Sequence, residues 1–202
     1  MEELNCPICN TKSSGIFKKS GISYDICPKC NCCYTLDYID PETDNEGDKA
    51  RNLDNINKLR MERIIFYGPD NNSLVDFGCG NGQFVDFAGI FFNEVYGIDK
   101  NTDMQLLKLT SNSIDVINCV EVIEHLIKPR EIVEEFYRIL RPDGIVYLES
   151  SFTDNLVDLS KSSYVDPNIG HVLIHSKKSI EILFDKFEVR WLNNNVVIFK
   201  KV

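Results

Sequence analysis

Short apolar runs alternate along most of the chain with stretches that space their apolar residues at helical intervals. Beyond residue 72 this pattern predicts four strands with helices between them: strands Ser73–Phe77, Glu94–Ile98, Ile114–Cys119 and Ile145–Glu149, and helices Gln83–Phe92 and Pro129–Leu140. Strands that alternate with helices are typical of a mostly parallel sheet covered by helices on both faces. The pattern therefore predicts a doubly wound α/β domain.

The C-terminal segment predicts one more helix and a hairpin. Ser176 can cap a helix over Lys177–Asp185. Two apolar runs follow, Phe187–Leu192 and Val196–Lys200, and asparagines 193–195 separate them. Because asparagine tolerates the left-handed backbone of a tight turn, we expect these two runs to pair as antiparallel strands.

The cysteines divide the chain unevenly. Six of the eight lie within the first 33 residues: Cys6, Cys9, Cys27, Cys30, Cys32 and Cys33. We expect residues 1–36 to form a small metal-bound module, because so short a segment cannot bury a self-sufficient core. The acidic, turn-rich residues 37–50 then form a linker. Residues 51–202 form the main domain, whose first helix is predicted over Ala50–Tyr67.

Four of these cysteines have the spacing of metal ligands. They form two Cys-x-x-Cys pairs with seventeen residues between them: Cys6 with Cys9, and Cys27 with Cys30. Two such pairs place four thiolates in a tetrahedron around zinc, at about 2.3 Å each. Because protein fills all four positions, the site is closed and its zinc is structural. Cys32 and Cys33 are interpreted as packing or spare thiols, and the sequence leaves open whether one of them replaces a ligand.

A glycine-rich turn follows the first predicted strand of the main domain, in the run Val75-Asp76-Phe77-Gly78-Cys79-Gly80-Asn81-Gly82. Glycines at the start of a helix let backbone N–H groups approach a ligand. A dinucleotide fingerprint would need glycine at position 83, where this chain has Gln83. An acidic residue about 20 residues after the turn suits two ribose hydroxyls, and Asp99 stands there. The two features together predict nucleoside binding.

The chain resembles the class I S-adenosylmethionine-dependent methyltransferases, in the subgroup of quinone-biosynthesis and sugar methyltransferases. Beyond the glycine turn, the resemblance rests on three further segments: Ser113–Leu126 with its Glu-Val-Ile-Glu-His run, Leu140–Gly144, and Gly170–Val172 with Ser176. It covers residues 51–202 and implies a Rossmann-like methyltransferase fold. The cysteine module resembles the zinc ribbon of some bacterial and archaeal members, among them sugar C-methyltransferases.

The resemblance assigns roles by position. Asp76 would orient the turn and the methionine ammonium, and Asp99 would hold the ribose. The turn itself would be made by Gly78, Cys79, Gly80 and Gly82. The end of the fourth family strand would line the reacting side of the cofactor with Cys119, Val120 and Glu121.

One segment departs from the family pattern. Only the fourteen residues Lys100–Ser113 separate Asp99 from the next strand, where the family fits a third strand with helices around it. Met104–Leu109 can form one short helix. Because a crossover alone needs about 10–12 residues, we expect the third strand to be short or missing and the adenine pocket to be open.

Two histidines are candidate catalytic bases, since histidine titrates near neutral pH. His171 follows a long polar loop, Thr153–Gly170, that could cover a substrate. His125 follows the strand that lines the reacting side. Both residues also admit an interpretation as packing or capping residues.

Charge and composition narrow the partners. The 22 Lys and Arg against 31 Asp and Glu give a net charge of −9, so the averaged field repels phosphate backbones and disfavours nucleic acid as a partner. No apolar run is long enough for a membrane span and no secretory signal opens the chain, which predicts a cytoplasmic protein. The sequence leaves the oligomeric state open.

The leading interpretation is an enzyme that transfers a methyl group from S-adenosylmethionine to a small molecule, such as a sugar or nucleotide-sugar. One alternative is a degenerate methyltransferase fold that acts as a zinc-dependent protein-interaction module. Another is a protein or ribosomal methyltransferase that uses the cysteine module to dock its substrate.

Overall fold

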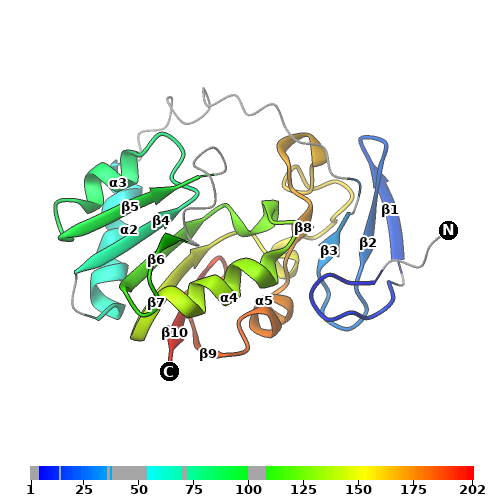
Figure 1. The fold of residues 1–202 in the computed structure, drawn as a ribbon. Helices are drawn as coiled ribbons and strands as arrows, with labels where there is room; N and C mark the ends of the chain where they lie inside the picture. The colour runs from blue at the N-terminus through cyan, green and yellow to red at the C-terminus, as the bar shows by residue number, and fades with distance from the viewer. Residues whose placement is uncertain (1–4, 14, 36, 38–53, 70–71, 100–107) are drawn as a thin grey trace.

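A computed structural model describes residues 5–13, 15–35, 37, 54–69, 72–99 and 108–202. The main domain is built on a six-stranded sheet with the order β5-β4-β6-β7-β10-β9 (Figure 1). The strands are β4 (Ser73–Phe77), β5 (Glu94–Ile98), β6 (Ile114–Val120), β7 (Leu140–Glu149), β9 (Phe187–Trp191) and β10 (Val196–Lys201). The first four strands run parallel, and β10 is antiparallel to both β7 and β9.

Helices cover both faces of this sheet. Alternate residues of each strand point to opposite faces, so neighbouring residues enter different cores. Leu74 packs with Met61 of α2 (Asp54–Tyr67) and with residues of α3 (Gln83–Ala88). Its neighbour Val75 packs with Phe136 of α4 (Pro129–Ile139) and with residues of α5 (Lys177–Leu183). The predicted doubly wound α/β fold with a C-terminal antiparallel hairpin is confirmed.

The cysteine-rich segment forms a second, four-stranded sheet with the order β1-β2-β3-β8. Its first three strands are β1 (Gly15–Lys19), β2 (Ile22–Ile26) and β3 (Cys33–Tyr34). The fourth, β8 (Leu173–Ile174), belongs to the main domain and pairs antiparallel with β3. The module lies beside the end of the main domain that carries β8 and α5 (Figure 1).

Most predicted boundaries agree with the structure, and the differences have local causes. The helix predicted to Phe92 ends at Ala88, and the following residues continue in tighter turns, in which the N–H of Phe91 donates to the Ala88 carbonyl at 2.9 Å. The strand predicted from Ile145 begins at Leu140, because Leu140 already pairs with Ile114 before a shift in register. The segment after β6, for which the apolar pattern predicted no element, forms a 3₁₀ turn, η2 (Ile123–His125).

Two further 3₁₀ turns, η3 (Thr153–Asn155) and η4 (Pro167–Ile169), shape the long loop between β7 and β8. Among the described residues, the main sheet ends at β5, and most of the segment in which the third family strand would lie falls outside these residues. The helix predicted over Met104–Leu109 falls mostly outside the described residues. None of the described helices is long and apolar enough to cross a membrane.

Candidate functional site

The glycine turn joins the end of β4 to the start of α3, at the carboxyl edge of the parallel strands. Three of its residues have positive φ angles: Gly78 (+86°), Gly80 (+52°) and Gly82 (+83°). L-residues rarely adopt this backbone, which explains the choice of glycine. At Gly78 a Cβ atom would also lie 2.1 Å from Cγ2 of Val122, so the turn packs directly against the segment that follows β6.

Asp99 stands directly after β5, on the strand next to β4. Its Oδ2 accepts a hydrogen bond of 3.0 Å from the backbone N–H of Gly80. Parallel pairing of β4 with β5 brings Asp99 beside the turn although 19 residues separate the two groups. The predicted pair of glycine turn and acidic residue is therefore assembled in space.

Asp76 is buried at the end of β4. Its Oδ1 accepts a hydrogen bond of 2.6 Å from Nδ2 of Asn118 on the neighbouring strand β6. Burial raises the pKa of Asp76 to about 6, while the Asn118 bond and the charge of Arg60 oppose that rise. The carboxylate is thus ionised at neutral pH and held in a poorly solvated position.

Arg60 of α2, whose positive charge acts on this carboxylate, was missed by the sequence analysis. Its Nε is buried without a hydrogen-bond partner among the described residues, and so is Oδ1 of Asn118. The Arg60 Nε lies 3.7 Å from Oε2 of Glu149, and its guanidinium lies 5.5 Å from the ring centre of Phe84. Buried polar atoms are nearly always hydrogen bonded, so the Asn118 oxygen next to Asp76 and the Arg60 Nε, which both lack a hydrogen bond in the described part of the chain, fit a polar ligand group. The sequence signal that could have revealed Arg60 is a positively charged residue on the side of α2 that otherwise faces the core.

Residues 119–121, at the end of β6 and directly after it, form the β6 exit, which lies beside the end of β7. Cys119 is buried, whereas Glu121 is exposed and adopts a φ of +52°. Val120 pairs with Glu149, and the backbone N–H of Glu121 donates to the Glu149 carbonyl at 2.9 Å. The three residues predicted to line the reacting side therefore stand one strand away from Asp76.

A cluster of polar side chains forms around Glu124, which follows the β6 exit in the chain. Glu124 accepts hydrogen bonds from Tyr164 Oη at 2.5 Å and from Ser150 Oγ at 3.2 Å. Nε2 of His171 lies 3.8 Å from Glu124, and the ring centre of His125 lies 4.6 Å from that of His171. Burial raises the pKa of Glu124 to about 8. Burial also lowers the pKa of His171 to about 4, with the nearby His125 as a second cause.

Sequence reasoning placed both histidines near the acceptor but missed their contact with Glu124. Ligand atoms of Glu124, His125 and His171 lie within 4.8 Å of one another, close enough to share a cation. Both carboxylate oxygens of Glu124 are already hydrogen bonded, so the cluster is also satisfied as a network of neutral groups. Nδ1 of His171 completes it through the Tyr164 carbonyl at 2.6 Å.

The four predicted metal ligands come together. The sulfur atoms of Cys6, Cys9, Cys27 and Cys30 all lie within 4.8 Å of one another. Examples are 3.6 Å from Cys6 to Cys30 and 3.4 Å from Cys9 to Cys27. Four converging thiols at these separations can surround one metal ion, since tetrahedral thiolates about 2.3 Å from zinc stand roughly 3.8 Å apart.

A fifth thiol touches this group. Sγ of Cys32 is buried and lies 3.5 Å from the sulfur atoms of both Cys6 and Cys30. Cys33, in contrast, packs away from the group in a small core with Tyr24 and Ile174. The two thiols that the spacing could not assign thus have different surroundings.

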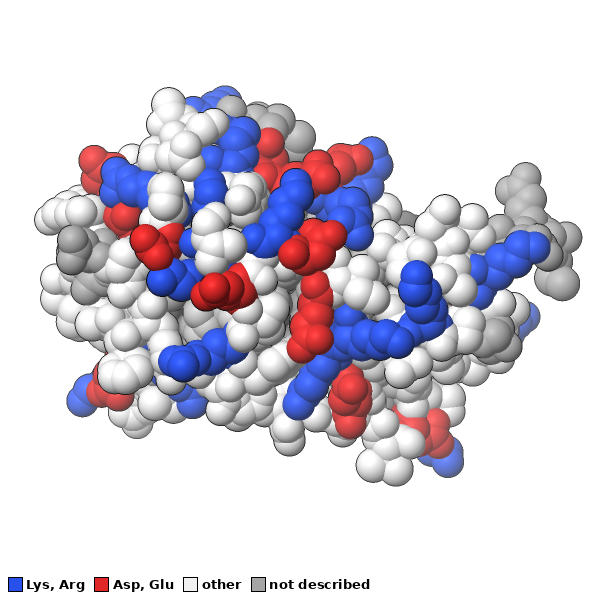
Figure 2. Space-filling view, turned by 90° about the horizontal axis from the view of Figure 1, so that it is seen from below, with Lys and Arg blue, Asp and Glu red and all other residues white. Residues whose placement is uncertain are grey.

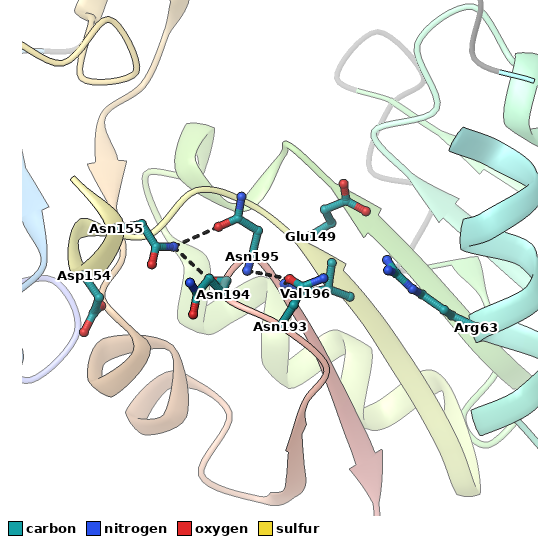
Figure 3. A pocket seen from close by; sticks show the side chains of 8 residues that line it. All are labelled: Arg63, Glu149, Asp154, Asn155, Asn193, Asn194, Asn195 and Val196. Atoms are coloured by element: carbon teal, nitrogen blue, oxygen red, sulfur yellow. Dashed lines mark hydrogen bonds between the residues drawn. The ribbon is translucent and has the colours of Figure 1, made fainter. Parts of the chain in front are cut away.

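A polar cavity of about 730 Å³ opens between α2 and the β9–β10 turn (Figure 3). It is lined by Arg63, Glu149, Asp154, Asn155, Asn193, Asn194, Asn195 and Val196. Nδ2 of Asn155 donates to the Asn194 carbonyl at 2.9 Å and to Oδ1 of Asn195 at 2.8 Å, which ties the loop after β7 to the turn. Neither the glycine turn nor His171 lines this cavity, but Glu149 links it to Arg60 and to the exit of β6.

The surface charge is mixed on the face that Figure 2 shows. Basic and acidic side chains are interspersed there, over the main domain as well as toward the cysteine module (Figure 2). A nucleic-acid surface instead concentrates lysine and arginine along a stripe or patch. This face therefore gives no support to a nucleic-acid partner.

The doubly wound sheet, with the glycine turn and Asp99 side by side at its carboxyl edge, defines an α/β protein of the Rossmann-like class. Residues 44–190 match the sequence profile of a family described as "Methyltransferase domain". The chain belongs to this family, and its fold is that of the class I S-adenosylmethionine-dependent methyltransferases.

Individual relatives agree with this assignment. A ubiquinone biosynthesis O-methyltransferase of Pseudomonas putida is 25% identical over 125 residues, which cover 48% of this chain and 53% of that protein. A malonyl-[acyl-carrier protein] O-methyltransferase of Marinomonas sp. is 22% identical over 161 residues, which cover 67% of this chain and 59% of that protein. The chain spans little more than half the length of the curated relatives it matches.

Solved structures show the same fold. An amino pentose methyltransferase of Micromonospora echinaspora with bound S-adenosylmethionine has a TM-score of 0.61 at 12% identity, covering 82% of this chain and 100% of that one. An S-adenosylmethionine-dependent methyltransferase of Archaeoglobus fulgidus has a TM-score of 0.56 at 18% identity, covering 73% and 94%.

Proposed function

We propose that the protein transfers a methyl group from S-adenosylmethionine to a hydroxyl-rich small molecule, such as a sugar or a nucleotide-sugar. The observation that carries the proposal is the hydrogen bond between Asp99 and the Gly80 backbone, which joins the two parts of a nucleoside site. Bound S-adenosylmethionine supplies an activated methyl group on a sulfonium. The residues of this chain bind and orient the two reactants, which alone can lower a barrier by several kcal/mol.

The glycine turn and Asp99 would hold the nucleoside end of the cofactor. The carboxylate of Asp99 would accept from ribose hydroxyls, while Gly78, Cys79, Gly80 and Gly82 keep the backbone close. The two buried atoms without a hydrogen bond among the described residues, Asn118 Oδ1 and Arg60 Nε, suit the amino-acid end of the cofactor. We assign Asp76 and Oδ1 of Asn118 to the methionine ammonium and Arg60 Nε to its carboxylate, since each charge then meets its opposite. The Cys119–Glu121 exit would face the sulfonium.

We assign the acceptor to the polar cavity of Figure 3. Pockets for aromatic or acyl ligands are lined mainly by apolar side chains. Here Val196 is the one apolar side chain of the lining, among amides and charged groups. Oε2 of Glu149 is engaged by Tyr147 at 3.0 Å and by Arg60, which leaves its Oε1 as an acceptor. Such a mixture of donors and acceptors favours hydroxyls over a hydrophobic ring.

His171 and His125 are our candidates for the base that takes a proton from the acceptor. The lowered pKa keeps His171 neutral at physiological pH, as a base requires. Both rings pack at the Glu124 side of the β6 exit, behind Ser150. The backbone N–H of Ser150 donates to the Asn195 carbonyl of the cavity wall at 3.0 Å, which connects the two regions.

We also propose that Cys6, Cys9, Cys27 and Cys30 bind one structural zinc ion. Their mutual distances support a closed four-thiolate site, in which no position remains for water. Zinc would fold residues 1–36 as a ribbon, and residues 37–50 would connect it to the methyltransferase domain of residues 51–202.

The test is methyl transfer from S-adenosylmethionine labelled in its methyl group. Nucleotide-sugars and free sugars should accept label, whereas a phenolic quinone precursor should accept little. A double variant of the cavity wall, Asn193→Ala with Asn195→Ala, should raise the acceptor KM but leave cofactor binding unchanged. Label on the phenol alone would refute the acceptor class. Label on a protein substrate, or no cofactor binding at all, would favour the two alternative functions.

A further inference from the structure

One buried side chain of the cysteine module contacts the part of the main domain around His171 and Glu124, here called the acceptor side. Tyr24 of β2 is fully buried, and its hydroxyl donates a hydrogen bond of 2.7 Å to the backbone carbonyl of His171. The two residues are 147 positions apart in the sequence. This hydroxyl is therefore a direct tie between the module and a candidate catalytic residue.

The residues after His171 are also hydrogen bonded to the cysteine module, through their backbone groups. The carbonyl of Val172 accepts from the backbone N–H of Thr35 at 2.9 Å, and the N–H of Val172 donates to the Glu124 carbonyl at 3.0 Å. Leu173 and Ile174 then pair with β3 of the module. Segment 171–174 thus lies between the cysteine module on one side and Glu124 on the other.

In the described part of the structure this segment pairs with the cysteine module and not with the main sheet. β8 contains two residues, and β3 is its strand partner among the described elements. Without the module its backbone groups would lose their partners, and unpaired backbone groups are costly when buried. The position of the His171 ring against Glu124 and Tyr164 consequently depends on a surface that the module provides.

We propose that Tyr24 is a positioning residue for methyl transfer, which fixes His171 and the segment after it against Glu124 through its bond to the His171 carbonyl. The module then has a second role besides binding metal, because its contacts fix the position of the segment that carries His171. This inference rests on the proposed methyl-transfer function. It assigns Tyr24 no contact with the cofactor or with the acceptor.

The variant Tyr24→Phe removes the hydroxyl and keeps the ring. Tyr34→Phe is the matched control, because Tyr34 is an equally buried tyrosine of the same module whose hydroxyl is hydrogen bonded to Ser13 within it. Tyr24→Phe should lower kcat about tenfold or more, as expected for a displaced reactive group, with KM for S-adenosylmethionine and zinc content unchanged. Tyr34→Phe should keep the parent kcat.

Hydrogen exchange supplies a readout that needs no turnover. Amides of residues 164–175 should exchange faster in Tyr24→Phe than in the parent or in Tyr34→Phe, while amides of residues 73–99 stay unchanged. Equal kcat losses in the two variants, or equal protection of residues 164–175 in all three proteins, would overturn the proposal. If the parent protein binds no S-adenosylmethionine, the proposed function is refuted. Hydrogen exchange of residues 164–175 then still decides whether Tyr24 fixes the His171 segment.

Discussion

The cofactor side and the acceptor side of this protein are built in different ways. On the cofactor side, the Gly80 to Asp99 bond joins residues 19 positions apart across two adjacent strands. On the acceptor side, bonds such as Tyr24 to His171 and Thr153 to Asn31 join residues 147 and 122 positions apart. The first side is a local motif on a parallel sheet, whereas the second depends on the cysteine module being folded.

Loss of the metal should separate the two sides most strongly. Cys27→Ser should reduce bound zinc from about one per chain to near zero and abolish turnover, because apparent zinc binding energies of about 10–16 kcal/mol fold small structural modules. Metal analysis and a methyl-transfer assay check this. Cys32→Ser is the matched control, since its thiol lies 3.5 Å from two of the ligands, and it should keep its zinc. A zinc-loaded, active Cys27→Ser protein would contradict the ligand assignment.

Removal of the candidate base should affect only the acceptor side. If His171 takes the acceptor proton, His171→Ala should lower kcat roughly 10²–10⁴-fold. Affinity for S-adenosylmethionine, measured by calorimetry, should stay within about twofold of the parent, because kcat and binding then report on separate groups. A variant that is less stable but equally active per folded molecule would show that His171 is a packing residue.

A change at Asp99 should affect only the cofactor side. Asp99→Ala removes the acceptor for ribose hydroxyls, which should cost about 1–3 kcal/mol of binding free energy. The dissociation constant of S-adenosylmethionine should then rise about 5-fold to 150-fold. Zinc content should not change. If Asp99→Ala binds the cofactor as tightly as the parent, the ribose assignment is wrong.

The smallest expected effect is a pH dependence of cofactor binding. Burial raises the pKa of Asp76 to about 6, so its carboxylate is ionised at pH 7 and becomes protonated as the pH falls below 6. A neutral Asp76 loses its attraction for the methionine ammonium. The dissociation constant should therefore rise about tenfold between pH 7 and pH 5. Asp76→Asn should bind weakly with a flat profile, and an equally steep profile in that variant would assign the effect to another group.

The predictable part of the fold is the part fixed by local pattern. Strands Ser73–Phe77 and Glu94–Ile98 were predicted with the boundaries that the structure shows, because apolar runs and flanking turns define them. The two-residue strand Leu173–Ile174 carries no periodic signal and exists only because β3 pairs with it. Its place in the cysteine sheet is a consequence of tertiary structure that no local pattern encodes.

The residues of the candidate site also fall into two groups: those predictable from a local motif and those that only the tertiary structure reveals. The glycine turn and Asp99 follow from a motif, and the structure brings them together as expected. Arg60 appears in the sequence as one cation on a helix, and only its burial, with its charge acting on Asp76, reveals it. Glu124 stands within a recognised segment, but its bond to Tyr164 depends on how the loop after β7 folds.

The central claim is that the glycine-turn side binds S-adenosylmethionine, and calorimetric titration of the zinc-loaded protein tests it most directly. We expect saturable binding at one site per chain, weakened by Asp99→Ala and unaffected by Tyr24→Phe. A titration that shows no saturable binding to the zinc-loaded parent would refute cofactor binding at the glycine turn. The protein would then be a methyltransferase fold that has lost its cofactor site.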